Sequence, residues 1–276
     1  MRTLEAITVR DGGRLARRLS EEMVLAAALL TRLPLPRIEI VTGAHLASAF
    51  WAYPVVGAIV GAFGAGAYAV CEALDLGMFI STFVALAAMV GVTGAFHEDG
   101  LADFCDGIGG GQSREDKLEI MRDSRIGTYG AMALMFLVIL LGAVLVELSI
   151  SPLQPLIGGF SSVFIVVGAL QRAAIGVPLA LLQPARAEGY TVAAGRPPIR
   201  ALAAGVGLAT LLAVTLLGPA AALAGLAGAA AAAGLVTLIA WRYLGGFTGD
   251  ALGATAATSG FAALLGLLMY AKSIPV

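Results

Sequence analysis

Long stretches without ionisable side chains alternate with short charged stretches along most of this chain. A helix needs about 20 apolar residues to cross the hydrocarbon core of a membrane, and most of the uncharged stretches reach that length. The stretch 201–241 is long enough for two helices, because Gly218 and Pro219 supply a turn within it. The pattern therefore predicts an all-α fold, a polytopic membrane helix bundle with about seven transmembrane helices, at residues 46–70, 77–97, 128–148, 157–181, 200–217, 220–241 and 251–271.

The N-terminal segment 15–33 differs from these stretches, because Glu21, Glu22 and Arg32 interrupt its apolar residues. It predicts an interfacial or re-entrant helix rather than a span. No soluble domain or low-complexity tail is apparent, so residues 1–276 are predicted to form a single integral membrane domain. Gly57 and Gly61 favour close helix contacts within the monomer, while a homo-oligomer stays open.

The composition agrees with a chain that resides in a lipid bilayer. Hydrophobic residues make up 59% of it, charged residues 13%, and the mean hydropathy is +0.92. A soluble domain carries about 25% charged residues. The net charge of −1 gives no reason to expect a nucleic-acid partner.

Lysine and arginine are gathered on alternate polar segments, which indicates the orientation of the chain in the membrane. If the N-terminus is inside, only Lys272 falls outside, and Arg172 lies within a span. The bias predicts that four segments face the cytoplasm: 1–45, 98–127, 182–199 and 242–250. The last three contain acidic and basic residues that make them candidate catalytic loops.

One of these segments begins with an unusual concentration of acids. If the second span continues as a helix through residue 106, Asp99, Asp103 and Asp106 share one helix face at spacings of four and three residues. Like charges repel there, so converging carboxylates predict a hard divalent cation, Mg²⁺ or Mn²⁺. Glu98 could join through the helix end or through water, and His97 is a weaker candidate. The competing interpretation is a solvated acidic loop.

A glycine run and a mixed-charge stretch follow the acids. The run predicts a turn at which the amides of Gly109 and Gly110 approach an anion. Farther on, Asp123 and Arg125 lie among alternating acids and bases, while Lys117 and its two acidic neighbours indicate an ordinary surface helix. Carboxylates, arginines and glycines together are typical of a site for a metal-bound diphosphate.

Other candidate residues come from the remaining predicted cytoplasmic segments. Asp250 follows Thr248 at the start of the last span and is either a helix N-cap or a further ligand or base. Arg186 lies in the 182–199 segment. Arg172 is expensive to bury within a span, so it is also a site candidate.

Three motifs resemble the signatures of the cobalamin synthase family, the adenosylcobinamide-GDP ribazoletransferases: HEDGLADFCDGIGGG at 97–111, KLEIMRDSRIGTYG at 117–130 and GGFTGDALGA at 245–254. Three shorter stretches fit the same pattern: LLTRLPLP at 29–36, FWAYPVVGAIVG at 50–61 and ARAEGY at 185–190. The resemblance thus runs over most of the chain. In one departure, the glutamate that the family has a few residues after the third motif is absent from residues 255–258.

The resemblance implies a multi-pass enzyme of the bacterial inner (plasma) membrane, with its active site facing the cytoplasm. Such an enzyme joins adenosylcobinamide-GDP to α-ribazole or α-ribazole 5′-phosphate, releases GMP and requires Mg²⁺. It gives adenosylcobalamin or its 5′-phosphate, in the last steps of cobalamin (vitamin B12) biosynthesis. The 3′-hydroxyl of α-ribazole would attack the phosphorus linked to cobinamide.

Combined with this reaction, the residue patterns assign roles to the candidates. The predicted metal ligands are Glu98, Asp99, Asp103, Asp106 and Asp123, and the predicted base is Asp123 or Asp250. The predicted substrate-binding residues are Arg125, Arg186, Arg172, Gly109, Gly110 and Thr248. Two alternatives are an enzyme like the CDP-alcohol phosphotransferases and a transporter with an acidic ion site.

Overall fold

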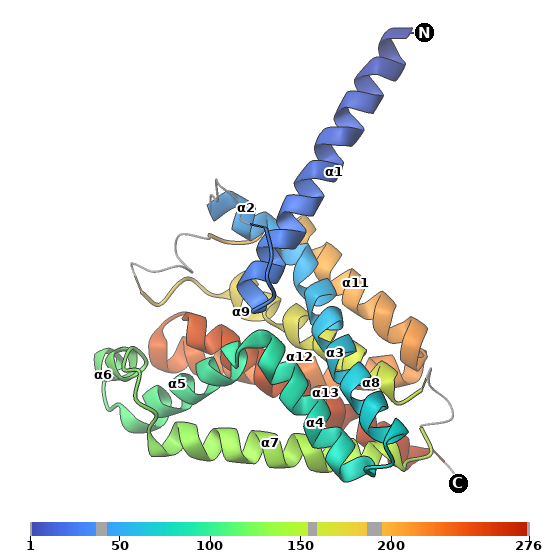
Figure 1. Cartoon of the computed structure of the whole chain (residues 1–276). Helices are drawn as coiled ribbons and strands as arrows, with labels where there is room; N and C mark the ends of the chain where they lie inside the picture. The colour runs from blue at the N-terminus through green and yellow to red at the C-terminus, as the bar shows by residue number, and fades with distance from the viewer. Residues whose placement is uncertain (1, 37–42, 154–158, 187–194, 275–276) are drawn as a thin grey trace.

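In the described part of the chain the regular structure is helical, with connecting loops and one isolated bridge (Figure 1). The computed structural model describes residues 2–36, 43–153, 159–186 and 195–274. The elements are α1 (Arg2–Leu30), α2 (Gly43–Ser48), the 3₁₀ helix η1 (Ala49–Ala52), α3 (Tyr53–Ala73), α4 (Met78–Thr93), α5 (Phe96–Gly110), α6 (Arg114–Ile120), α7 (Thr128–Ser149), α8 (Ser161–Ala174), α9 (Gly176–Leu181), α11 (Ile199–Leu217), α12 (Pro219–Leu244) and α13 (Gly249–Ser273).

Most of these helices are long and apolar enough to cross a membrane. Within the described residues six helices qualify, some with a short neighbour included, and the bent pair α4–α5 would raise the number to seven. The six are Gly43–Ala73, Thr128–Ser149, Ser161–Leu181, Ile199–Leu217, Pro219–Leu244 and Gly249–Ser273. The all-α prediction and the number of spans are therefore confirmed, and the chain is a multi-pass membrane protein.

The second predicted span, 77–97, is not a straight helix that continues through residue 106. Helix α4 ends at Thr93, and α5 leaves it at an angle of 88°. Gly94 and Ala95 both adopt left-handed conformations, and the Ala95 amide bonds the Val90 carbonyl at 3.0 Å, an arrangement that terminates helices. The three aspartates nevertheless share a helix, because α5 carries all of them.

Glycines let the helices of the bundle approach to backbone contact. A Cβ on Gly57 would overlap the backbone of Gly168, and a Cβ on Gly61 would overlap the carbonyl of Phe164. Both contacts join α3 to α8. The prediction that this glycine pair packs within the monomer is therefore confirmed.

Helix α1 is longer than the segment predicted for it, and it is not among the helices that could span a membrane. Its C-terminal part buries Leu25, Ala26 and Leu30 against η1 and the start of α3. The N-terminal part projects away from the bundle (Figure 1). Buried Glu22 fastens α1 to η1 by accepting a hydrogen bond from the Trp51 indole at 2.7 Å.

Candidate functional site

The three predicted catalytic loops meet at one end of the bundle. The backbones of Gln183 and Ala185 pair with Phe247, through N···O distances of 2.9 and 2.8 Å. Arg114, in the first loop, donates to the carbonyls of Leu244 at 2.8 Å and of Ala185. One guanidinium therefore ties all three segments together, although residues 187–194 of the second loop lie outside the described residues.

Helices α5 and α13 cross with almost no space between them. A Cβ on Gly100 would lie 3.1 Å from the Gly253 Cα and 3.3 Å from the Asp250 Cα. The two glycines come from the first and third motifs. Their contact brings the start of α13 against the helix that carries Asp99 and Asp103.

The result is a cluster of carboxylates with one arginine, which we call the acidic cluster: Asp99, Asp103, Asp250 and Arg186. Charge interactions with Asp99, Asp250 and Arg186 all act on Asp103. Arg186 Nη2 lies 3.7 Å from Asp250 Oδ2, and only about a fifth of either side chain is exposed. The same guanidinium donates to the Leu118 carbonyl at 3.1 Å. Helix α5 and the third motif therefore face one another.

Asp250 is not the N-cap of α13. The cap is Thr248, whose hydroxyl accepts a bond from the Ala251 amide at 3.1 Å. Asp250 Oδ2 is buried and has no hydrogen-bond partner. Asp250 is therefore available to act on a ligand, whereas Thr248, predicted to bind substrate, is itself buried and holds the helix end.

Asp106 caps a helix from another part of the chain. It is buried, and its two oxygens accept bonds from the amides of Gly127 at 2.7 Å and Gly130 at 2.9 Å. These bonds hold the N-terminus of α7, where a negative charge is stabilised. A Cβ at either glycine would overlap the carboxylate, which explains the glycines of the second motif. The structure gives Asp106 a structural role that the sequence analysis did not foresee.

Asp123 and Arg125 bond to each other at the surface. The Arg125 amide and Nε donate to Asp123 Oδ1 at 3.1 and 3.0 Å, and 87% of the arginine side chain is exposed. These bonds lower the pKa of Asp123 to about 2. So weak a base is poorly suited to accept a proton, which disfavours Asp123 as the catalytic base. The roles of Asp123 in metal binding and of Arg125 in phosphate binding stay predictions.

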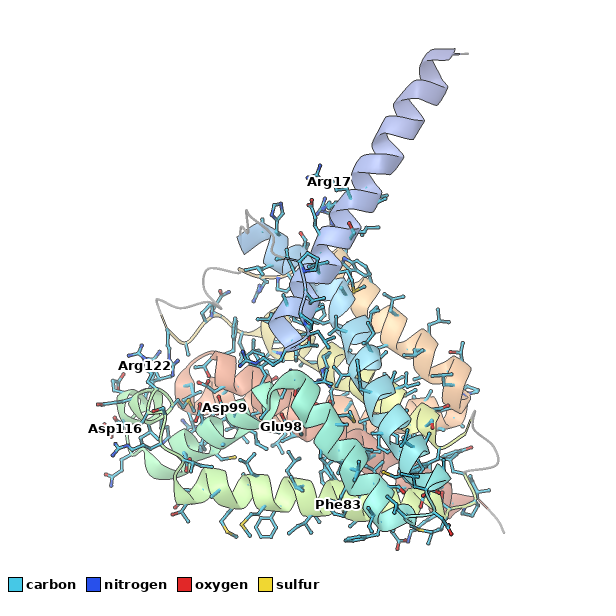
Figure 2. The ribbon with its side chains drawn as sticks, viewed as in Figure 1. Arg17, Phe83, Glu98, Asp99, Asp116 and Arg122 are labelled. Carbon is cyan, nitrogen blue, oxygen red and sulfur yellow. The ribbon has the colours of Figure 1, made fainter. Side chains whose placement is uncertain are left out.

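Glu98 and Arg172 form a separate polar centre. Arg172 is buried and Glu98 is half-buried, and the buried atoms Glu98 Oε2 and Arg172 Nε lack hydrogen-bond partners. The charge of Glu98 acts on Arg172, and both line a small cavity of about 50 Å³ with Leu86 and Gln171. Figure 2 shows Glu98 nearer to α4 than Asp99 is. Consecutive residues of a helix point about 100° apart, so Glu98 turns into the bundle, away from the acidic cluster.

The glycine run is not the predicted turn, because α5 continues through Gly110. Amides in the last turn of a helix are bonded to carbonyls of the preceding turn, so the reason for expecting Gly109 and Gly110 to bind an anion is wrong. Gly109 instead packs under the ring of Tyr129.

Lys117, predicted on a surface helix, is buried, with its amine on the Gly111 carbonyl. The sequence reasoning also missed Arg114, Gly100 and Gly253. The two glycines could have been found from their position inside predicted helices, where glycine is unfavourable unless close packing requires it.

Metal binding would depend on the acidic cluster. Among the described residues no group of three or more histidine, cysteine or acidic side chains is already close enough to enclose a cation. Mg²⁺ commonly takes only one or two carboxylates and completes its shell with water and substrate phosphate. Asp99 and Asp103, with Asp250 Oδ2 nearby, which pairs with Arg186 but accepts no hydrogen bond, offer that kind of donor set.

The fold and the cluster define the class: a multi-pass membrane protein whose acidic and basic side chains converge at one end of the bundle. The sequence profile described as cobalamin-5-phosphate synthase matches residues 22–268, and the chain belongs to this family. It is thus an enzyme of the cobalamin synthase type, and the resemblance predicted from the three motifs is confirmed.

Relatives cover nearly the whole chain. An adenosylcobinamide-GDP ribazoletransferase of Mesorhizobium japonicum is 39% identical over 249 residues, which are 90% of this chain and 93% of the relative. The protein of that name from Bradyrhizobium diazoefficiens is 39% identical over 88% of this chain and 92% of its own. The one from Azorhizobium caulinodans is 41% identical over 80% and 84%. No solved structure matches the chain.

Proposed function

We propose that the chain joins adenosylcobinamide-GDP to α-ribazole or α-ribazole 5′-phosphate. In this reaction the ribazole 3′-oxygen forms a bond to the phosphorus linked to cobinamide. The phosphoanhydride bond to the second phosphorus breaks, and GMP leaves with the bonding electrons. The products are adenosylcobalamin, or its 5′-phosphate, and GMP. Membership of the family carries this assignment, and the acidic cluster supports it.

The proposed active site uses the acidic cluster in two ways. Asp99 and Asp103 would hold Mg²⁺, which when bound neutralises the oxygens of the diphosphate. Arg186 would donate to the same oxygens, since a guanidinium binds phosphate through paired N–H groups. Its present neighbour Asp250 is near enough to orient it.

Asp250 is the proposed general base. Its Oδ2 has no hydrogen-bond partner, so it can receive the proton of the attacking 3′-hydroxyl. Arg186 then faces both the phosphate and the carboxyl group that has taken the proton. Asp106 maintains the geometry by fixing α7 to α5.

We place the acidic cluster at the cytoplasmic face of the bacterial inner membrane. The support is the excess of lysine and arginine in the three segments that meet there. Lipid would contact exposed apolar side chains of the outer helices, such as Leu223 and Leu211.

The test is turnover by the purified protein in detergent. GMP should appear only when both substrates and Mg²⁺ are present, and Asp250→Asn should abolish most of it. GMP release that does not depend on α-ribazole would contradict the proposal. Ion-dependent uptake into vesicles without GMP release would favour the transporter, and release of CMP from a CDP-alcohol would favour the phosphotransferase.

A further inference from the structure

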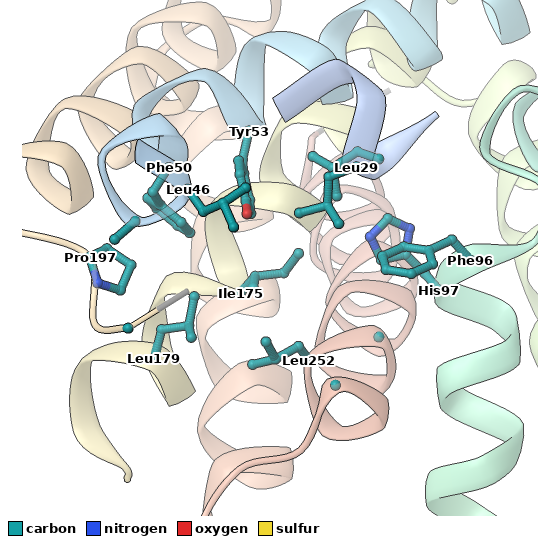
Figure 3. A pocket seen from close by; sticks show the side chains of 15 residues that line it. Leu29, Leu46, Phe50, Tyr53, Phe96, His97, Ile175, Leu179, Pro197 and Leu252 are labelled. Atoms are coloured by element: carbon teal, nitrogen blue, oxygen red, sulfur yellow. The ribbon is translucent and has the colours of Figure 1, made fainter. Parts of the chain in front are cut away.

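A cavity of about 330 Å³ lies beside the acidic cluster (Figure 3). Its wall is mostly apolar, with Phe50, Ile175 and Leu179 among its side chains. Gly249 and Gly253, which flank Asp250 in α13, form part of the same wall. The cavity therefore opens an apolar space directly next to the proposed base.

The polar side chains of Tyr53 and His97 also line this space. His97 lines the cavity, only 4% of it is exposed, and its Nε2 has no hydrogen-bond partner. A buried nitrogen without a partner is destabilising, so its presence suggests a ligand that supplies the missing bond. In Figure 3 His97 and Leu179 lie on opposite sides of the cavity.

We propose that this cavity binds the fused aromatic base of α-ribazole. The inference rests on the proposed function and specifies where one substrate sits. The base is flat, apolar on both faces and carries one ring nitrogen that can accept a hydrogen bond. Cavities that bind small ligands are mostly apolar with a few placed polar groups, and volumes begin near 300 Å³.

The contacts fix the orientation of the base. A neutral imidazole has one N–H donor, which His97 presents through Nε2 to the free ring nitrogen of the base. The methylated benzene ring then lies among Phe50, Ile175 and Leu179. The ribose is attached to the second ring nitrogen, which is bonded to the same carbon as the hydrogen-bonded nitrogen. The ribose therefore leaves the cavity at the His97 end. There Gly253 packs against the His97 backbone, because a Cβ on Gly253 would lie 3.2 Å from the His97 carbonyl oxygen, and Asp250 is three residues away.

The first experiment measures α-ribazole binding to the purified protein in detergent, without Mg²⁺ and without adenosylcobinamide-GDP. Leu179→Trp fills the cavity from the side opposite His97, and His97→Phe keeps the ring but removes the donor. Both variants should raise the Kd for α-ribazole, His97→Phe by roughly tenfold, as expected for one lost hydrogen bond. Leu223→Trp, at an outward position that is 69% exposed, is the matched control and should leave the Kd unchanged.

The second experiment measures steady-state kinetics of the same variants. The KM for α-ribazole should rise in Leu179→Trp and His97→Phe, while the KM for adenosylcobinamide-GDP stays as in the wild type. Free dimethylbenzimidazole should compete with α-ribazole but not with adenosylcobinamide-GDP.

The outcomes separate the two proposals. Wild-type turnover with an unchanged KM for α-ribazole in both cavity variants would overturn the cavity assignment and leave the function standing. Binding of α-ribazole that the cavity variants weaken, without any turnover, would support the cavity and overturn the function. A cavity that retains co-purified lipid, with α-ribazole affinity the same in all variants, would identify an acyl chain as the occupant and overturn the inference.

Discussion

Gly253→Ala tests whether the crossing of α5 and α13 sets the geometry of the acidic cluster. The new Cβ would lie 3.0 Å from Gly100 Cα and 3.2 Å from the His97 carbonyl oxygen, both backbone atoms. Carbon atoms prefer separations of about 3.5–4.0 Å, so the helices must move apart by a few tenths of an ångström. No side chain can rotate to relieve this contact.

The expected effect on stability is smaller than the effect on rate. Overpacking costs about 1–3 kcal/mol, and alanine in place of glycine in a helix returns about 1 kcal/mol. The net destabilisation is therefore about 0–2 kcal/mol. A displacement of about 1 Å can lower a rate a hundredfold, so a shift of half that size should lower kcat/KM by roughly tenfold.

The assay is thermal unfolding in detergent together with kcat/KM for both substrates. Gly234→Ala is the control, because nothing lies within 4 Å of its added Cβ. This variant should be at least as stable as the wild type and equally active. If Gly253→Ala kept kcat/KM within about twofold of the wild type, the claim that close helix contact positions Asp250 would be refuted.

Four further predictions concern other residues of the site and the orientation of the chain. Asp103→Asn should fold normally and lose at least about a hundredfold in activity. Asp106→Asn should mainly lower the unfolding temperature, because it weakens the cap on α7 by about 1–2 kcal/mol. Normal activity in the first variant with normal stability and lost activity in the second would contradict the assignment. Arg125→Lys should fold normally yet lose roughly tenfold or more in kcat/KM, because lysine lacks the planar fork, and full activity would restrict Arg125 to its pair with Asp123. The pKa of Asp123 is about 2 in the folded chain, below the unfolded value of about 3.9. The small stabilisation from the exposed Asp123–Arg125 pair should therefore be present above about pH 4 and be lost as the pH falls toward 2. Comparing the unfolding of Asp123→Asn with that of the wild type at both pH values measures this stabilisation. A cysteine at Ser113 should react with an impermeant reagent from the cytoplasmic side, and labelling from the periplasmic side alone would contradict the proposed orientation.

The sequence predicted the spans well, because uncharged runs of this length have few alternatives in a helical membrane protein. It also placed the three aspartates on one helix, since their spacing is local. The spacing could not reveal that the helix turns by 88° at Gly94 and Ala95. A left-handed alanine is a rare conformation that the surrounding packing imposes, and residue type alone does not predict it.

The sequence could not place the individual side chains of the site, because tertiary contacts decide between neighbouring residues. Asp250 and Thr248 were both able to cap α13 by residue type, and only the folded chain shows that Thr248 does so. Adjacent Glu98 and Asp99 were grouped as ligands, although one faces the bundle interior and the other the cluster. Asp106 accepts a hydrogen bond from the N-terminus of α7, and no local sequence pattern predicts such a long-range contact.

The Gly100–Gly253 crossing also has a consequence for how the protein is made. Synthesis produces Asp99 and Asp103 early, and Asp250 only when the last membrane helix begins. Until α13 inserts, α5 lacks one of the helices that it packs against, and its aspartates lack the proposed base. Under the proposed mechanism catalysis therefore requires α13, and a nascent or truncated protein without it would insert the helices on either side of its first two motifs yet leave any bound nucleotide diphosphate untouched.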